Sequence, residues 1–284
     1  MNSSPGRTRG SELRRWLDKL PKAELHLHLE GAIPLDALWA LIQKYGGDPS
    51  VPTETHLRQR LTYSDFPDFI ETWIWKNSFL RTYDDFSFIA EKVAQDLLRQ
   101  NILYAELFFS PSRFADRGLT TIGLAKAIRS GLGRVSGCEI WLIADLVRDH
   151  GPIQAAITLT EVATARHYGI VGIGIGGSEH KFPPEPFAEL YAEARRLGFK
   201  TSAHAGEASG ADSVRGAIDS LLVDRIGHAT RAEEDPQLMQ LLADRQIPIE
   251  LCPLSNVATG VIASITDHPV RRYWDRGLLV TVNT

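Results

Sequence analysis

Short apolar runs alternate with stretches of helical periodicity along most of this chain. Eight of the runs have the length and composition of β-strands, and the segments between several of them repeat apolar residues near the 3.6-residue period of an α-helix. The predicted strands are 24–29, 103–109, 139–146, 170–175, 200–203, 225–227, 248–251 and 279–282, and the clearest helices are 122–132, 152–168, 184–197 and 236–245. Strands that alternate with helices form parallel sheets, and eight of them in 284 residues favour an α/β fold of the TIM type, a closed (β/α)8 barrel, over a doubly wound sheet.

The segment 51–99 interrupts this alternation between the first and second predicted strands. It is rich in aromatic side chains, namely Tyr63, Phe66, Phe69, Trp73, Trp75, Phe79, Tyr83, Phe86 and Phe88. We expect a helical insertion that covers one end of the barrel. Two compatible interpretations stay open: ordinary core packing of an extra helical pair, and a lid over a flat aromatic substrate.

Composition and charge indicate which partners and which cellular location to expect. The hydrophobic fraction of 43% and charged fraction of 23% are those of an ordinary globular protein, and the net charge of −4 gives no reason to expect nucleic acid as a partner. No apolar stretch is long enough to span a membrane, and the polar, basic N-terminus does not resemble a secretory signal. Cys138 and Cys252 are far apart, so we expect no disulfide framework and a cytoplasmic location. We expect a disordered tail at residues 1–10 and a single domain over 11–284, while the oligomeric state stays open.

The first predicted strand carries the clearest candidate chemistry. It reads Glu24-Leu-His26-Leu-His28-Leu-Glu30, and because successive side chains of a strand face opposite ways, the two histidines and the two glutamates share one face. Two histidines at positions i and i+2 can converge on one metal ion. This pattern inside an apolar run therefore favours metal binding over a pair of ordinary core histidines.

Further polar residues follow later strands. His204 and Glu207 come after the fifth strand and His228 ends the sixth, so all three belong at the carboxyl end of the barrel, where such barrels place their sites. Glu250 lies in the apolar seventh strand, where a carboxylate is costly unless it has a partner; a nearby histidine is one candidate and a salt bridge another. Three histidine ligands with an open position form the arrangement of a catalytic zinc site. The glycine-rich run 172–177 lacks the helix spacing of a dinucleotide fingerprint, so no such cofactor is expected.

From about residue 20 to its end, the chain resembles the adenosine deaminase family. The resemblance rests on five motifs in order: HLHLEGA (26–32), GIGGSE (174–179), HAGE (204–207), RIGHA (225–229) and ELCPLSN (250–256). It implies a zinc-dependent hydrolase that removes the 6-amino group of adenosine or a related adenine nucleoside or base and releases ammonia. The implied roles are one zinc ion held by His26, His28 and His204, proton donation to the purine ring by Glu207, proton removal from water by His228, substrate contacts from Gly177 and Glu30, and orientation of His228 by Glu250.

The chain departs from the classical adenosine enzymes in places that bear on the substrate. Glu30 stands where they have an aspartate, and Gly174 and Ser178 stand where they have acidic residues. We therefore expect a pocket that holds the 6-aminopurine ring but treats the 5′ side differently, with adenine, 5′-modified adenosines and aminofutalosine-type nucleosides as alternatives to adenosine. The family pattern continues past Thr284 into two aspartates, one of them a metal ligand, and a last helix, so we expect a barrel truncated at its C-terminus.

Two other functions remain as alternatives. One is a metal-dependent barrel hydrolase that attacks an amide or a phosphoester. The other is a non-catalytic relative that binds nucleosides. The presence of Glu207 and His228 together favours the deaminase over both.

Overall fold

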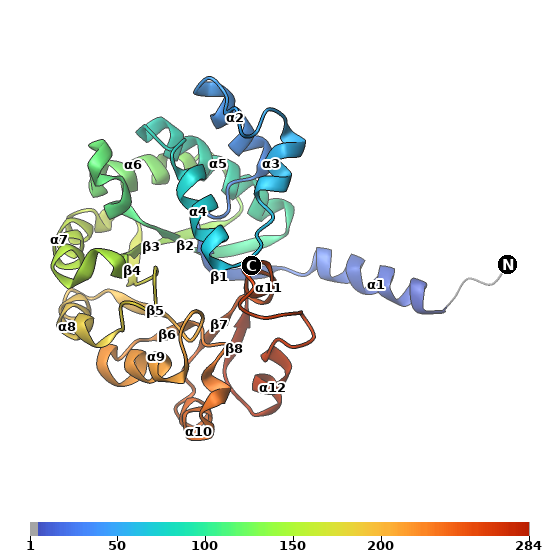
Figure 1. Ribbon diagram of the computed structural model, residues 1–284, viewed down its shortest axis with the longest axis vertical. Coiled ribbons are helices and arrows are strands. Elements are labelled where there is room, and N and C mark those ends of the chain that lie inside the picture. The colour runs from blue at the N-terminus through green and yellow to red at the C-terminus, as the bar shows by residue number, and fades with distance from the viewer. Residues whose placement is uncertain (1–4, 284) are drawn as a thin grey trace.

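Eight parallel strands surround the centre of the molecule in the computed structural model, which describes residues 5–283 (Figure 1). They pair in sequence order from β1 to β8. The strands are β1 (Lys22–His28), β2 (Ile102–Phe109), β3 (Glu139–Asp145), β4 (Ile170–Gly174), β5 (Lys200–Ala205), β6 (Arg225–His228), β7 (Ile249–Leu251) and β8 (Val280–Val282). The Leu25 N–H donates to Oδ1 of Asn283 just after β8, at 3.0 Å, which brings the two ends of the sheet together. The result is a nearly closed barrel of the TIM type, and the eight predicted strands are confirmed.

Helices surround the barrel on its outside (Figure 1). The α-helices are α1 (Pro5–Lys19), α2 (Leu35–Lys44), α3 (Glu54–Arg60), α4 (Phe66–Asn77), α5 (Tyr83–Arg99), α6 (Thr121–Leu132), α7 (Gly151–Thr164), α8 (Ala188–Arg196), α9 (Ala211–Gly216), α10 (Pro236–Arg245), α11 (Pro253–Ala258) and α12 (Val270–Asp275). Short 3-10 turns are η1 (Pro111–Arg117), η2 (Arg148–His150), η3 (Arg166–Tyr168), η4 (Glu185–Phe187) and η6 (Ala232–Glu234), and η5 (Ala217–Leu221) is a π-helical turn. The four predicted helices correspond to α6, to α7 with η3, to η4 with α8, and to α10.

The segment between β1 and β2 combines both interpretations of the aromatic-rich insertion. Helix α5 packs against α6 and β2 and buries Phe86, so it belongs to the outer ring of the barrel. It begins with a capping box in which Thr82 and Asp85 satisfy each other's backbone N–H groups. Helix α4, by contrast, places Phe66, Phe69 and Trp73 along a cavity. Core packing and coverage of the pocket are thus divided between two helices.

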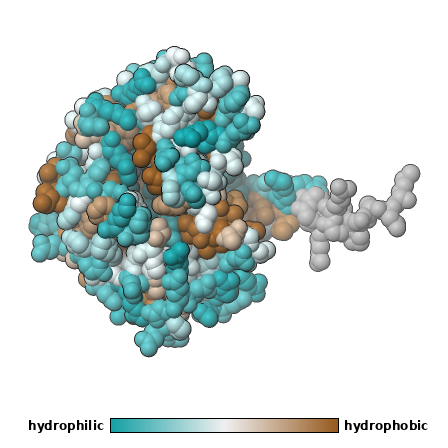
Figure 2. Space-filling model, in the orientation of Figure 1, coloured by the Kyte–Doolittle hydropathy of each residue, from teal (hydrophilic) through white to brown (hydrophobic). Residues whose placement is uncertain are grey.

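Helix α1 projects away from the barrel (Figure 1). The expected disordered tail covered residues 1–10; residues 1–4 lie outside the described part, and residues 5–10 belong to this helix. Apolar side chains gather where α1 leaves the barrel (Figure 2), and four apolar residues of this region are exposed: Leu13, Trp16, Leu17 and Leu20. Within the described residues, no helix has the length and hydropathy needed to cross a membrane.

Candidate active site

A cavity of about 450 Å³ opens at the carboxyl ends of the strands. Its wall receives residues from the ends of successive strands, as expected for the functional face of such a barrel. Six predicted site residues line it: His26, His28, Gly177, His204, Glu207 and His228. The cavity continues along α5, past Val93 and Leu97, so only part of its volume adjoins the histidines.

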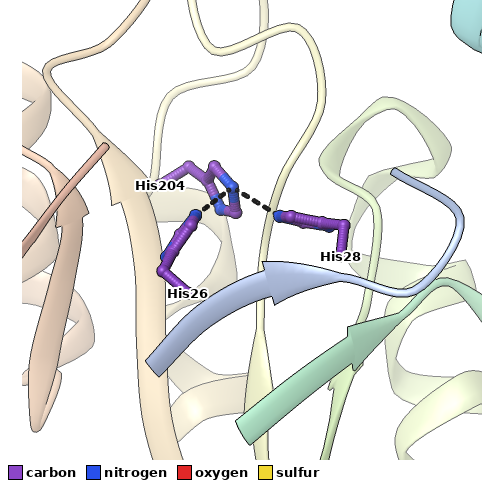
Figure 3. A group of neighbouring side chains, drawn as sticks. All are labelled: His26, His28 and His204. Atoms are coloured by element: carbon purple, nitrogen blue, oxygen red, sulfur yellow. Dashed lines mark hydrogen bonds between the residues drawn. The ribbon is translucent and has the colours of Figure 1, made fainter. Parts of the chain in front are cut away.

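Three histidines converge on one point of this cavity (Figure 3). Nε2 of His204 lies 3.1 Å from Nε2 of His26 and 3.0 Å from Nε2 of His28. Burial lowers the pKa of all three imidazoles, and their mutual repulsion adds to the effect for His26 and His204, so the rings are neutral at physiological pH. Neutral imidazole nitrogens that share a tetrahedral zinc ion are separated by roughly 3.3 Å, given metal–nitrogen distances of about 2.0–2.1 Å. The arrangement therefore fits a metal ion.

A second group of metal-ligating atoms comprises His26, His228 and Cys252. Burial raises the pKa of the Cys252 thiol well above its usual value, and the carboxylates around it reinforce the shift. A thiol binds a metal as the thiolate, so this environment disfavours Cys252 as a ligand. The group of three histidines is the better candidate.

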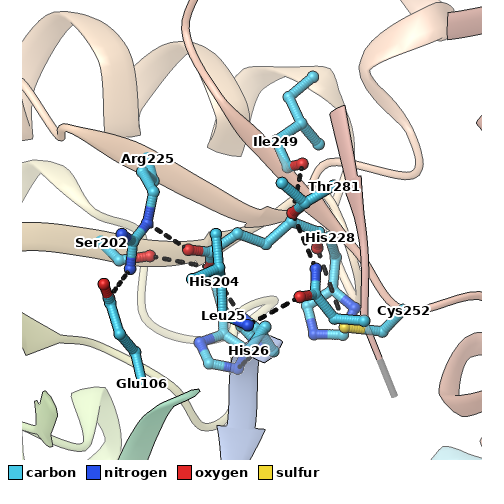
Figure 4. Close-up of polar contacts among 12 residues, drawn as sticks. Leu25, His26, Glu106, Ser202, His204, Arg225, His228, Ile249, Cys252 and Thr281 are labelled. Atoms are coloured by element: carbon cyan, nitrogen blue, oxygen red, sulfur yellow. Dashed lines mark hydrogen bonds and ion pairs between the residues drawn. The ribbon is translucent and has the colours of Figure 1, made fainter. Parts of the chain in front are cut away.

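Glu250 supports this cluster through hydrogen bonds with His26 and Arg225, which are both labelled in Figure 4. It is fully buried, its Oε2 accepts from Nδ1 of His26 at 2.8 Å, and its Oε1 accepts from Nε of Arg225 at 2.5 Å. A carboxylate on the outer nitrogen of a metal-binding histidine fixes the tautomer and directs the other nitrogen towards the metal. The expectation that Glu250 orients His228 is corrected: its partner among the histidines is His26.

Gly227 explains why His26 can reach Glu250. Gly227 pairs in register with Glu250 between β6 and β7, and a Cβ atom at this position would lie 2.6 Å from Cε1 of His26. Only a residue without a side chain lets the imidazole of β1 cross the barrel interior to β7. The glycine before His228 in the RIGHA motif therefore supports the histidine cluster directly.

His228 is held by a different residue. Asn256, buried in α11, places its amide 3.0 Å from Nδ1 of His228 and 3.3 Å from Nε2 of His268. His228 has a φ of 66°, a left-handed conformation that is uncommon for residues other than glycine and is concentrated at functional sites. Asn256 is not among the predicted site residues, and its only signal in the sequence is its place in the ELCPLSN motif.

Glu207 faces His228 across the cavity, with Oε2 3.5 Å from Nε2 of the imidazole. Burial raises the pKa of Glu207 to about 8, and the charge of Glu179 reinforces the shift while Arg148 opposes it. The carboxyl group is therefore protonated at neutral pH and can donate a proton.

The two predicted substrate contacts differ in position. Gly177 lines the cavity with a φ of 113°, and a Cβ atom there would collide with Oδ2 of Asp149, so the position requires glycine. Glu30 lies beyond the end of β1, in a turn, and is fully buried outside the cavity lining. Its Oε1 accepts from the Ser110 N–H at 2.9 Å. The expectation that Glu30 shares the strand face of the histidines and points into the pocket is corrected, because the strand ends at His28.

Phe108 accounts for one of the sequence departures. This residue of β2 stacks on His28 and contacts the His26 ring, both with ring centroids 5.0 Å away. A Cβ atom at Gly174 would lie 2.8 Å from the Phe108 ring. An acidic side chain at position 174 is therefore incompatible with Phe108 in this place.

Comparisons with known proteins agree with this geometry. Residues 21–284 match the family model described as adenosine deaminase. An adenine deaminase of Bordetella avium is 35% identical over 275 residues, which cover 96% of this chain and 87% of that protein. The crystal structure of an adenine deaminase from Arthrobacter aurescens is 32% identical with a TM-score of 0.85, over 93% of this chain and 81% of the other. A zinc-bound amidohydrolase from Burkholderia ambifaria is 28% identical with a TM-score of 0.85, over 100% of this chain and 78% of the other.

The order of the motifs, the barrel that brings them to one cavity, and a family match over nearly the whole sequence all lead to one conclusion. The chain belongs to the adenosine deaminase family.

Proposed function

We propose that this protein is a zinc-dependent hydrolytic deaminase of 6-aminopurines, with one zinc ion per chain. The observation that carries the proposal is the convergence of three histidine nitrogens beside Glu207 and His228 in one cavity. Burial raises the pKa of Glu207 and lowers the pKa of His228, which suits an acid and a base. The names of the relatives favour adenine as a substrate. The zinc bound to the Burkholderia protein supports zinc as the metal.

His26, His28 and His204 would hold the metal. A zinc ion bound there supplies Lewis acidity that makes water nucleophilic at neutral pH. Glu250 accepts the Nδ1 proton of His26 and so keeps the Nε2 lone pair directed at the metal site.

The chain's own residues account for the proton transfers. Water oxygen adds to C6 of the purine, and His228 takes the proton that the water loses; burial lowers the pKa of His228 to about 4, so the imidazole is neutral and free to accept it. Glu207 donates its proton to the ring nitrogen beside C6, which prevents negative charge from building there. His228 then returns its proton to the amino group, the C6–N bond breaks and ammonia leaves. The C6 hydroxyl gives its proton back to Glu207 and becomes the C6 carbonyl oxygen. Gly177 offers its backbone N–H to another ring nitrogen.

The test is a substrate panel. The protein is incubated with adenine, adenosine and guanine at equal concentration, and ammonia release is followed. We expect release from at least one adenine compound and none above background from guanine, whose amino group is not at C6. Release from neither of these adenine compounds, nor from AMP, would refute the proposal.

A specific observation favours purines with an anionic substituent as a second candidate substrate class. Lys76 of α4 lines the cavity with only 4% of its surface exposed, and its ammonium donates to the Gly31 carbonyl at 3.3 Å. Arg113 also lines the cavity, with its guanidinium 4.7 Å from the Trp73 ring. Glu30 is the carboxylate that acts electrostatically on both cations. Two cations on one wall of a substrate cavity suit a phosphate or carboxylate.

Lys76→Met tests this class because it keeps the length of the side chain and removes the charge. If the substrate is anionic, kcat/KM for AMP or for a 5′-carboxylated adenosine exceeds that for adenosine, and Lys76→Met removes the preference. The comparison of the two anions shows which group the site prefers. Equal loss of kcat/KM on adenine, adenosine and AMP would assign Lys76 to the fold instead.

A further inference from the structure

One buried carboxylate collects an unusual number of backbone N–H groups beside the candidate active site. Glu179, in the loop after β4, has 3% of its surface exposed. Its Oε1 accepts from the Gly206 N–H at 2.5 Å, and its Oε2 accepts from the N–H groups of Glu207, Ala208 and Ser209 at 3.1, 2.7 and 3.1 Å. Four consecutive residues after β5 therefore turn around a single anion.

Glu207 is one of these four residues. Gly206, which precedes it, has a φ of 75°, so the chain leaves β5 in a conformation that directs successive N–H groups to one side. Charge-assisted hydrogen bonds to backbone N–H groups are roughly twice as strong as neutral ones. The carboxylate of Glu179 thus holds the N–H groups of this turn, while the Gly206 carbonyl accepts from the Arg231 N–H and the Thr230 hydroxyl.

Glu179 also contacts the loop that carries Gly177. The Glu179 N–H donates to the Gly177 carbonyl at 2.8 Å. Gly177 and Glu207 are the two residues whose atoms are assigned to the purine ring. Glu179 consequently connects the loop that carries Gly177, through its main chain, to the turn that carries Glu207, through its side chain.

Arg148 supplies the opposite charge nearby. It is fully buried, its Nη1 donates to the Phe182 carbonyl at 2.8 Å, and its Nη2 donates to the His204 carbonyl at 2.5 Å. It thereby ties the end of β5 to the loop after β4 from the other side. A buried cation near the buried anion reduces the cost of keeping Glu179 charged.

We propose that Glu179 is a positioning residue for deamination. It keeps Glu207 and Gly177 in the places where both can contact the purine ring, and it does not touch the substrate itself. This inference rests on the proposed function. Its physical basis is that a carboxylate can accept four N–H bonds at once, whereas a carboxamide has one accepting oxygen and an NH2 group that would face other donors. Loss of the anion therefore releases the 206–209 turn, and a displacement of about 1 Å at a catalytic group can cost about 10²-fold in rate.

The test compares Glu179→Gln and Glu179→Asp with the wild-type protein, and uses Asp85→Asn as a matched control. Asp85 is also a buried carboxylate that accepts backbone N–H groups, those of Arg81 and Thr82, but it caps α5 in the insertion. For each variant, kcat, KM, metal content, Tm and amide hydrogen exchange at residues 206–209 are measured.

We expect Glu179→Gln to lower kcat about 10²-fold with metal content retained, and to speed exchange at 206–209 by tenfold or more. Glu179→Asp, which keeps the charge, restores part of kcat and part of the protection. Asp85→Asn lowers Tm but leaves kcat and the exchange at 206–209 within about twofold.

Two results overturn the inference: unchanged exchange at 206–209 in Glu179→Gln, or accelerated exchange with an unchanged kcat. If Glu179→Gln does not fold, Glu179→Asp decides, because its shorter side chain must still loosen the turn and lower kcat. Absence of deamination by the wild-type protein would refute the proposed function, and the exchange data would then still decide whether Glu179 anchors this turn.

Discussion

In the proposed mechanism, protonation of the purine ring depends on Glu207. Glu207→Gln keeps the size of the side chain and removes its acidic proton, so we expect turnover to fall by roughly 10²–10⁴-fold while metal content and Tm stay near those of the wild type. Steady-state kinetics with metal analysis checks this. A variant that deaminates at a near-normal rate would show that the ring is protonated by another group.

The environment of Glu207 also predicts the direction of the pH dependence. Burial raises its pKa to about 8, the charge of Glu179 adds to the shift and Arg148 opposes it. His228 and Cys252 are further titratable groups around it. The acid must be protonated to act, so kcat/KM is retained below this pKa and falls as the pH rises through about 8. A profile in the free enzyme that stays level from about pH 7 to pH 10 would contradict this assignment.

A substitution at Gly227 tests whether the space left by this glycine of β6 keeps the His26 imidazole in place at the proposed metal site. Gly227→Ala places a methyl group against the His26 imidazole, which must then rotate away from Glu250. We expect metal affinity to fall by roughly 10–100-fold, the usual effect of disturbing a histidine's outer partner. Competition with a metal chelator measures the change. Unaltered affinity would mean that the strands move apart to accommodate the methyl group while the His26 imidazole keeps its position.

The position of a site residue could be predicted from the sequence where the alternation of side chains along a strand determines it. The partner of a residue could not be predicted where side chains meet across the barrel. Alternation along β1 and strand-end positions were enough to bring His26, His28, His204 and His228 to one cavity. The pairing of Glu250 with His26, and of His228 with Asn256, depends on the register between strands and on the space left at Gly227. Glu30 was misplaced because β1 ends two residues before it, which a repeating pattern does not reveal.

At the scale of elements, α4 and α5 divide the aromatic residues of the insertion between two tasks. Phe86 of α5 is buried in the core, and Phe69 of α4 lines the cavity. Phe86→Ala should therefore lower the free energy of unfolding by about 3–5 kcal/mol with little change in KM, and Phe69→Ala should raise KM with a smaller loss of stability. Denaturant unfolding and substrate kinetics on both variants test the division. The reverse pattern would show that α4 stabilises the fold and that α5 shapes the pocket.

The element boundaries show why the insertion was harder to interpret than the barrel. Each barrel strand is bounded by a helical pattern, so its length is constrained from both sides. The region 51–99 contains three helices, and two of them, α4 and α5, carry several aromatic residues each. Local periodicity does not say which face of either helix meets the barrel. Only the packing of α5 against α6 and β2 separates the helix of the outer ring from the helix over the cavity.

At the scale of the whole molecule, the barrel brings histidines from β1, β5 and β6 to one cavity. A ligand that binds only the folded state stabilises it, by about 4 kcal/mol when its concentration exceeds Kd 1,000-fold. Because the three proposed metal ligands come from β1 and β5, which are far apart in the sequence, the metal should stabilise the barrel as a unit. The eight-stranded order follows from the sequence, but the convergence of three Nε2 atoms to about 3 Å follows only from the closed sheet.

We propose that deamination by this protein requires a zinc ion bound to His26, His28 and His204. The most direct measurement is ammonia release from adenine and adenosine by one protein sample before chelation, after complete metal removal, and after titration with zinc. We predict that release stops when the metal is removed and recovers fully at one equivalent of zinc per chain. Release that persists in the verified metal-free protein, or that zinc does not restore while the fold is intact, would contradict the account.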